Sequence, residues 1–181
     1  VLSILPIFHG FGLGVCIHTP LSVGMGAILI PSFSFKKFGD IIRKNKPTFI
    51  AGVPTLYEAL LESNIGSNDL ECVKSVICGG DALNTTLRDK VNDFLQAHGS
   101  NAKIRVGYGL TEATGACCLT PDNVFEDNII GMPLPDTYIK IVIPDTHETA
   151  PVGEDGEICV SGPLVMMGYV NDDAETMQAL R

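Results

Sequence analysis

Residues 75–109 read SVICGGDALNTTLRDKVNDFLQAHGSNAKIRVGYG, and this stretch decides the fold. Residues 75–78 and 104–106 are short apolar runs, and each of them leads into glycine. Between them, Asn84 can cap a helix that Gly99 can close. The apolar positions of that helix recur at helical spacing, at Leu87, Val91, Phe94 and Leu95. A strand, a helix and a strand in succession predict two parallel strands joined by a crossover helix.

The same alternation extends toward the first residue. Further strands are predicted at residues 1–5, 27–30 and 48–51. Between them we expect a buried apolar helix over residues 11–23, a helix capped by Ser34, and a helix beginning at Pro54. Continuous apolar strands with helices between them predict an α/β fold, a parallel sheet with helices on both faces, over residues 1 to about 115.

The pattern changes after residue 115. Strands are predicted at residues 138–143 and 156–161 among frequent turns, and no long amphipathic stretch follows until Asp172. We therefore expect a β-rich segment. Residues 1–115 are interpreted as an α/β subdomain, and residues 116–181 as the β-rich part of the same domain.

The net charge of the 181 residues is −9, and the charged side chains are distributed unevenly along the chain. Residues 1–120 hold 9 acidic and 10 basic side chains (a net of +1), whereas residues 121–181 hold 12 acidic and 2 basic ones (a net of −10). This balance argues against nucleic acid or an anionic membrane surface as a partner, because both require excess Lys and Arg.

The cysteines indicate the redox compartment of the protein, and the uncharged run near the N-terminus raises the question of a membrane span. The six cysteines form no C-x-x-C pair and the four histidines are scattered, which disfavours a zinc site and indicates reduced thiols in the cytoplasm. Residues 10–30 are nearly free of charge, but His18, Pro20 and several glycines interrupt the run. We therefore expect no transmembrane segment.

Three of the predicted strands end in residues that suit a ligand site. These ends are residues 6–12, 79–81 and 107–112. In an open parallel sheet, ligands bind beyond the carboxyl ends of the strands. The aromatic face of Tyr108 can stack on a base, the Thr111 hydroxyl can bond a phosphate, and the Glu112 carboxylate can hold Mg²⁺. Together they favour a nucleotide-phosphate site over a hydrolase triad.

Each of these residues also has an ordinary structural interpretation. His9 can be a satisfied structural histidine, the Gly79-Gly80 pair a simple turn, Tyr108 a core residue, and Glu112 a charge at a helix end. A dinucleotide enzyme is disfavoured because no G-x-G-x-x-G follows the first strand. A non-catalytic binding module that kept the fold stays open as an alternative.

Five stretches together resemble the acyl-adenylate-forming enzymes, which include acyl-CoA synthetases, aryl-CoA ligases, luciferase and peptide-synthetase adenylation domains. They are LPIFHGFG at 5–12, CGGDAL at 78–83, GYGLTEA at 107–113, IGMPLP at 130–135 and GEDGEICVSGPLVMMGY at 153–169. The resemblance covers essentially the whole chain.

The resemblance implies roles for particular residues. On the nucleotide side, Tyr108 would stack on adenine. The adenine pocket would be lined by Gly80, Asp81, Ala82 and Gly109. Thr111 would contact the α-phosphate, and Glu112 would bind the metal. On the acid side, His9 would stand at the junction of the two sites. The acyl pocket would be lined by Phe11, Gly79, Gly107 and Gly109. Thr111, Glu112 and His9 would be the catalytic residues.

The implied reaction joins a small carboxylic acid to coenzyme A, using ATP and Mg²⁺ and passing through an acyl-adenylate. Leu110 and His9 stand where peptide-synthetase domains usually have Pro and Asp, so the resemblance favours a synthetase for fatty or aryl acids. It also implies that the chain is an internal fragment, without the family's phosphate loop, ribose-binding Asp and C-terminal domain. The isolated fragment is then expected to be inactive, to bind ATP weakly and to self-associate.

Overall fold

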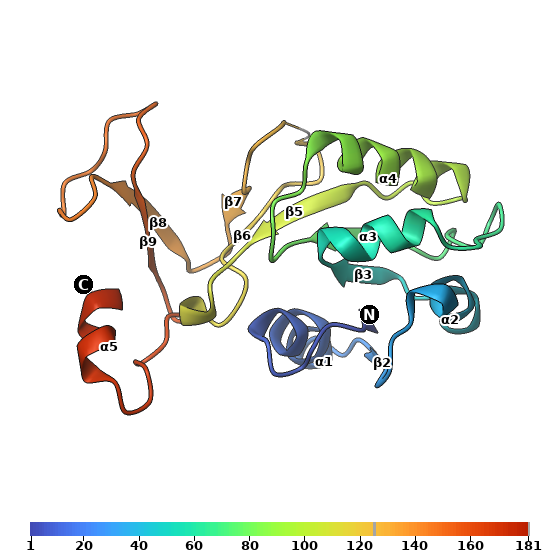
Figure 1. Ribbon diagram of the computed structural model, residues 1–181, viewed down its shortest axis with the longest axis horizontal. Helices are drawn as coiled ribbons and strands as arrows, with labels where there is room; N and C mark the ends of the chain where they lie inside the picture. Colours follow the sequence, from blue (N-terminus) through green and yellow to red (C-terminus); the bar gives the residue numbers. More distant parts are fainter. Residues whose placement is uncertain (125, 181) are drawn as a thin grey trace.

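The computed structural model describes residues 1–124 and 126–180, and Phe125 and Arg181, which fall in the predicted β-rich segment, lie outside it. Within the described residues, one seven-stranded sheet has the order β2-β1-β3-β4-β5-β6-β7, and β8 and β9 form a separate pair (Figure 1). The strands are β1 (Leu2–Ser3), β2 (Ile28–Leu29), β3 (Phe49–Gly52), β4 (Ser75–Cys78), β5 (Ile104–Tyr108), β6 (Cys118–Leu119), β7 (Met132–Pro133), β8 (Tyr138–Val142) and β9 (Glu157–Ser161). The helices are η1 (Phe11–His18), α1 (Thr19–Ser22), η2 (Phe35–Lys37), α2 (Phe38–Asn45), α3 (Pro54–Leu61), α4 (Thr85–Ala97), η3 (Thr111–Ala113) and α5 (Asp173–Ala179).

Strands β1 to β5 pair in parallel, which confirms the predicted parallel sheet. The register aligns Ile50 with Val76 and Val76 with Ile104. Strands β6 and β7 then extend the sheet in the antiparallel sense. The carboxyl ends of the parallel strands therefore lie along one edge of the sheet.

The alternation of side chains along each strand separates the two faces of the sheet. Ile50, Val76 and Ile104 belong to one buried cluster, with apolar side chains from α2, α3 and α4. On the opposite face, Ala51 packs with Cys16 of η1. Helices thus cover both faces, as predicted, although the η1 side has the smaller cluster.

Helix α4 begins and ends as the sequence predicts. The Asn84 side chain accepts a hydrogen bond from the backbone N–H of Leu87 at 2.8 Å, which satisfies a donor in the first turn. Beyond the last turn, Gly99 has φ +94, a conformation that glycine adopts at little cost. By contrast, the Ser34 side chain makes no capping hydrogen bond, and a 3₁₀ turn precedes α2.

Residues 11–30 form a helical segment followed by a strand, as predicted, but the prediction that both are buried was wrong. The chain there forms η1, with π-type hydrogen bonding, and the short helix α1. Leu13 and Leu21 are 51% and 57% exposed, and Leu29 on the edge strand β2 is 60% exposed. A segment that is apolar on every side carries no period that tells which side is buried. Only one side of this helix packs on the sheet, through Cys16.

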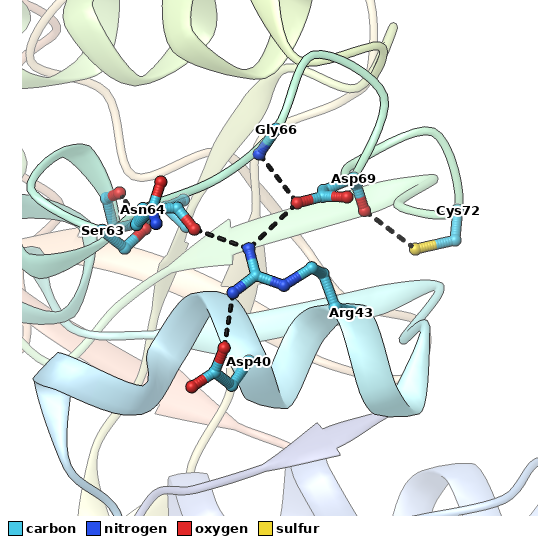
Figure 2. A network of polar contacts seen from close by, with 8 residues as sticks. Asp40, Arg43, Ser63, Asn64, Gly66, Asp69 and Cys72 are labelled. Carbon is cyan, nitrogen blue, oxygen red and sulfur yellow. Dashed lines mark hydrogen bonds and ion pairs between the residues drawn. The ribbon is translucent and has the colours of Figure 1, made fainter.

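Figure 2 shows how Arg43 ties α2 to the loop after α3. Its guanidinium donates to the Asn64 carbonyl at 2.6 Å and to Asp69 Oδ2 at 3.1 Å, and it also bonds Asp40. The backbone N–H of Gly66 donates to the same Asp69 oxygen at 2.7 Å. The Gly66 bond first, and Arg43 second, lower the pKa of Asp69 below its ordinary value. The carboxylate therefore stays charged and holds this loop at neutral pH.

The β8–β9 pair and α5 follow the main sheet (Figure 1, orange and red). Ile139 of β8 and Val160 of β9 pack against a buried cluster that includes Cys117 and Cys118. Among the described helices, none is both long and apolar enough to cross a membrane.

Tyr57 provides a test of the core. Its side chain is 0% exposed, and its hydroxyl donates to the Ile77 carbonyl at 2.6 Å. We expect Tyr57→Phe to lower the free energy of unfolding by about 1 kcal/mol, because the change removes one buried hydrogen bond and little packing. Urea unfolding measures this. Tyr138→Phe is the matched control, since Tyr138 is 71% exposed, and equal effects of the two changes would contradict the assignment.

Candidate functional site

Three predicted strand ends come together at the carboxyl edge of the sheet. A Cβ atom on Gly79, after β4, would lie 2.9 Å from the Gly107 carbonyl oxygen of β5 and 3.5 Å from the Phe11 ring. A Cβ on Gly10 would lie 3.1 Å from the Thr114 carbonyl oxygen. The structure therefore brings residues 9–11, 79–81 and 107–115 into mutual contact, and glycine permits the approach of the backbones.

The chain after β5 turns back sharply on itself. The Cys117 N–H donates to the Tyr108 carbonyl at 2.8 Å and the Gly115 N–H to the Leu110 carbonyl at 2.9 Å. A Cβ on Gly109 would lie only 1.4 Å from the Gly115 carbonyl oxygen, so this position has no space for a side chain. The turn presents η3, and with it Thr111 and Glu112, beside the strand end.

A first cavity of about 380 Å³ lies at this edge, on the η1 side of the sheet. The predicted residues that line it are His9, Phe11, Gly79, Gly80, Gly107, Tyr108, Gly109 and Thr111. Its wall also includes the apolar side chains of Val15, Val23 and Phe49. The cavity therefore suits a ligand with an apolar body and a polar end.

A second cavity of about 420 Å³ lies next to it, on the α4 side. It is lined by Gly80, Asp81 and Ala82, which were predicted to line an adenine pocket, and by Tyr108 and Gly109. Asp81 Oδ1 accepts from the Ala82 N–H at 2.7 Å, which fixes the turn after β4.

Tyr108 borders both cavities and is half-buried. Burial raises the pKa of its phenol above the ordinary value, so the hydroxyl is neutral at pH 7. A neutral ring at the boundary can stack on a planar ligand group on either side.

His9 lies at the rim of the first cavity with an exposed side chain. Its Nδ1 accepts a hydrogen bond from the Phe11 N–H at 3.1 Å. Because Nδ1 is the acceptor, the proton of the neutral ring is on Nε2. That N–H is available to donate to a ligand.

Glu112 lies in the next position after Thr111 but lines neither cavity. Its Oε1 accepts a hydrogen bond from the Tyr169 hydroxyl at 2.6 Å. This bond is the main cause that lowers the pKa of Glu112, so the carboxylate is ionised at neutral pH. No role was predicted for Tyr169, although it ends the last of the five stretches that resemble the family.

At η3, a metal ion would find the carboxylate of Glu112. Among the described residues, no group of three or more His, Cys, Asp or Glu side chains could hold a metal by itself. Mg²⁺ is commonly bound through one or two carboxylates together with the phosphates of a nucleotide. Glu112 therefore fits a metal that arrives with a phosphate ligand.

Comparisons with known proteins found similar sequences and structures. Residues 1–170 match the family model described as AMP-binding enzyme. A protein named Long-chain-fatty-acid--CoA ligase, from Bacillus subtilis (strain 168), is 37% identical over 185 residues, covering 100% of this chain and 32% of that protein. Probable 4-coumarate--CoA ligase 3 of Dictyostelium discoideum is 31% identical over 181 residues, covering 99% of this chain and 32% of that protein.

Solved structures give the same result. ATP-bound MatB from Rhodopseudomonas palustris superimposes with a TM-score of 0.85 at 26% identity, covering 99% of this chain and 35% of that one. O-succinylbenzoate coenzyme A synthetase (MenE) from Bacillus subtilis, in complex with ATP and magnesium ion, has a TM-score of 0.83 at 25% identity, covering 99% and 36%. The chain spans about a third of the length of the curated relatives it matches.

Gly109 provides a test of the site's backbone. We expect Gly109→Ala to lower the free energy of unfolding by about 2 kcal/mol or more, because the added Cβ would overlap the Gly115 carbonyl and force the turn apart. Gly26→Ala is the control, since nothing lies within 4 Å of a Cβ there. Urea unfolding of both variants measures the difference. A Gly109→Ala protein as stable as the control would show that the turn is not as tight as described.

Proposed function

This chain belongs to the AMP-binding enzyme family, and from that premise we propose that the protein containing it is an acyl-CoA synthetase that activates a carboxylic acid with ATP. The observation that carries the proposal is the pair of cavities that share Tyr108, one of them with an apolar wall. Thr111 stands at the edge of the first cavity, and an ionised carboxylate follows it in the chain. Two ligands could meet at this boundary.

On the nucleotide side, we assign adenine to the second cavity. Tyr108 would stack on the base, while Gly80, Asp81, Ala82 and Gly109 would line its pocket. The Thr111 hydroxyl would donate to an α-phosphate oxygen. Glu112 would hold Mg²⁺, which when bound with ATP supplies positive charge against the phosphate oxygens.

On the acid side, we assign the acyl group to the first cavity, lined by Phe11, Gly79, Gly107 and Gly109. The described residues that line it include no Lys or Arg to pair with a second carboxylate. An apolar fatty or aryl acid fits this wall better than a dicarboxylic acid, because an unpaired charge is costly to bury. The named activities of the similar ligases are consistent with this class.

The reaction would proceed in two steps. A carboxylate oxygen forms a bond to the α-phosphorus, and the bond from that phosphorus to the pyrophosphate oxygen breaks. The sulfur of coenzyme A then bonds to the acyl carbon, AMP leaves, and the thiol proton passes to solvent. His9 would donate from Nε2 near the reacting carboxyl group, and Thr111 would steady the α-phosphate in the first step.

The proposal also covers the cellular compartment of the protein and the small molecules that it uses. The six cysteines are free thiols, which supports a reducing compartment, and we assign the protein to the cytoplasm. ATP, Mg²⁺ and coenzyme A would be the small molecules it uses.

A nucleotide-binding module without catalysis would show ATP binding without pyrophosphate exchange.

Glu112→Gln in the full-length protein tests the metal role. We expect ATP–pyrophosphate exchange to fall about 100-fold, because a charged contact to the metal is lost while the shape of the side chain is kept. Glu154→Gln is the matched control, since Glu154 is an exposed carboxylate in the turn before β9. Exchange near the wild-type rate at saturating Mg²⁺ would remove Glu112 from this role.

The 181-residue chain by itself is expected to lack synthetase activity and to bind ATP only in the millimolar range. Residues 80–82 and Tyr108 would contribute the adenine wall, but the resembled enzymes also use a phosphate loop, an Asp that holds the ribose and a C-terminal domain with a catalytic Lys. Each charge-assisted hydrogen bond contributes about 1.5–3 kcal/mol. The loss of several of them therefore raises a micromolar dissociation constant to millimolar or above. Titration calorimetry with ATP and Mg²⁺ measures it, and a dissociation constant of about 10 µM or tighter would contradict the expectation.

The same chain should also self-associate. Its exposed apolar side chains include Phe8, Leu13, Leu21, Val23 and Leu29, from the loop after β1 through β2. Contiguous exposed apolar surface favours association in water. Sedimentation velocity of the isolated chain would measure this in the same samples.

A further inference from the structure

The hydrogen bond from Tyr169 to Glu112 joins residues that are 57 positions apart in the sequence. The hydroxyl oxygen lies 2.6 Å from Oε1 of the carboxylate. Hydrogen bonds from a hydroxyl to an ionised carboxylate are short and stronger than neutral ones. The donor is a neutral hydroxyl rather than a cation, so it orients the carboxylate without cancelling its charge.

The bond is part of a docked segment rather than an isolated contact. The Met166 N–H donates to the Glu112 carbonyl at 2.7 Å, and the Thr114 hydroxyl donates to the Leu164 carbonyl at 2.7 Å. Residues 164–169 therefore lie along η3 and bond both its backbone and its acidic side chain.

Helix α5 in turn fixes the backbone of Tyr169. The Tyr169 N–H donates to the Thr176 hydroxyl oxygen at 2.8 Å, and that hydroxyl donates to the Asp172 carbonyl at 2.8 Å. A Cβ on Gly168 would lie 2.9 Å from Cγ2 of Thr176, so the chain passes close to the helix here. The backbone that carries the phenol is therefore anchored, so the hydroxyl that donates to Glu112 has a fixed position. A solvent molecule that made the same hydrogen bond would not have one.

We propose that Tyr169 is a positioning residue for the metal-binding carboxylate of Glu112: its hydroxyl holds Oε1 and leaves Oε2 for Mg²⁺ bound with ATP. The inference rests on the proposed function, because it assigns Glu112 to the metal. A glutamate has three side-chain torsions, and a carboxylate that is already held loses less conformational freedom when a metal binds. The η3 turn contributes Thr111 from the same docked element, so the hydroxyl and the carboxylate are placed together.

Tyr169→Phe in the full-length protein tests this role, since it removes the hydroxyl and keeps the ring. The first measurement is binding of Mn²⁺, as a probe metal, in the presence of ATP, followed by electron paramagnetic resonance. We expect the Mn²⁺ dissociation constant to rise about 10-fold. The second is the Mg²⁺ concentration for half-maximal pyrophosphate exchange, which should rise by a similar factor while the rate at saturating Mg²⁺ stays within about 2-fold of wild type.

Two comparison variants separate positioning from general destabilisation. Tyr138→Phe removes an exposed phenol on β8 and should leave both metal measurements unchanged. Thr114→Val removes the bond to Leu164 without touching the carboxylate, and it should change the metal measurements much less than Tyr169→Phe. In a Glu112→Gln background, Tyr169→Phe should add no further loss of metal affinity, because the two residues act through one contact.

The outcomes distinguish this inference from the function on which it rests. Wild-type protein without Mg²⁺-dependent exchange would contradict the proposed function and the inference with it. Wild-type exchange together with an unchanged Mn²⁺ dissociation constant in Tyr169→Phe would overturn the positioning role alone. An equal loss in Thr114→Val would also overturn it, because docking of the segment, and not the hydroxyl, would then control the carboxylate.

Discussion

The parallel register of β3, β4 and β5 is the constraint on which the rest of the structure depends. Gly52 pairs with Cys78 and Cys78 with Val106, so these strands end at the same edge of the sheet. The loops that leave that edge approach one another closely at Gly79 and Gly10, where a Cβ atom would lie 2.9 Å and 3.1 Å from a neighbouring carbonyl oxygen. A shift of one residue in any of these pairings would turn buried side chains to the opposite face and separate the strand ends.

The two cavities of the site lie at this edge of the sheet, and their surroundings differ. Tyr108 ends β5 and borders both cavities, so the strand itself sets the boundary between an apolar wall and the turn at Asp81. The tight return at Gly109 then places Thr111 at the same boundary. Positioning of this kind, by strands and short turns, suits a reaction in which two bound groups must meet in one orientation.

The sequence predicted those parts of the fold that repeat with a regular period. Apolar runs located β3, β4 and β5, and Asn84 located the start of α4, because strand burial and helix capping are local properties. The all-round apolar helix after β1 was wrongly predicted to be buried, since composition alone does not say which neighbours are present. The motif resemblance named residues that the structure brings together. Tyr169 was missed because its partner is fixed by tertiary packing and not by any spacing in the chain.

The most direct test of the account is a crystal structure of the full-length protein with a non-hydrolysable analogue of a fatty acyl-adenylate. We expect adenine against Tyr108 in the cavity lined by Asp81 and Ala82, with the acyl chain along the apolar wall that includes Val15. An acyl chain outside the first cavity, or adenine on the Val15 side of Tyr108, would contradict the assignment of the two cavities.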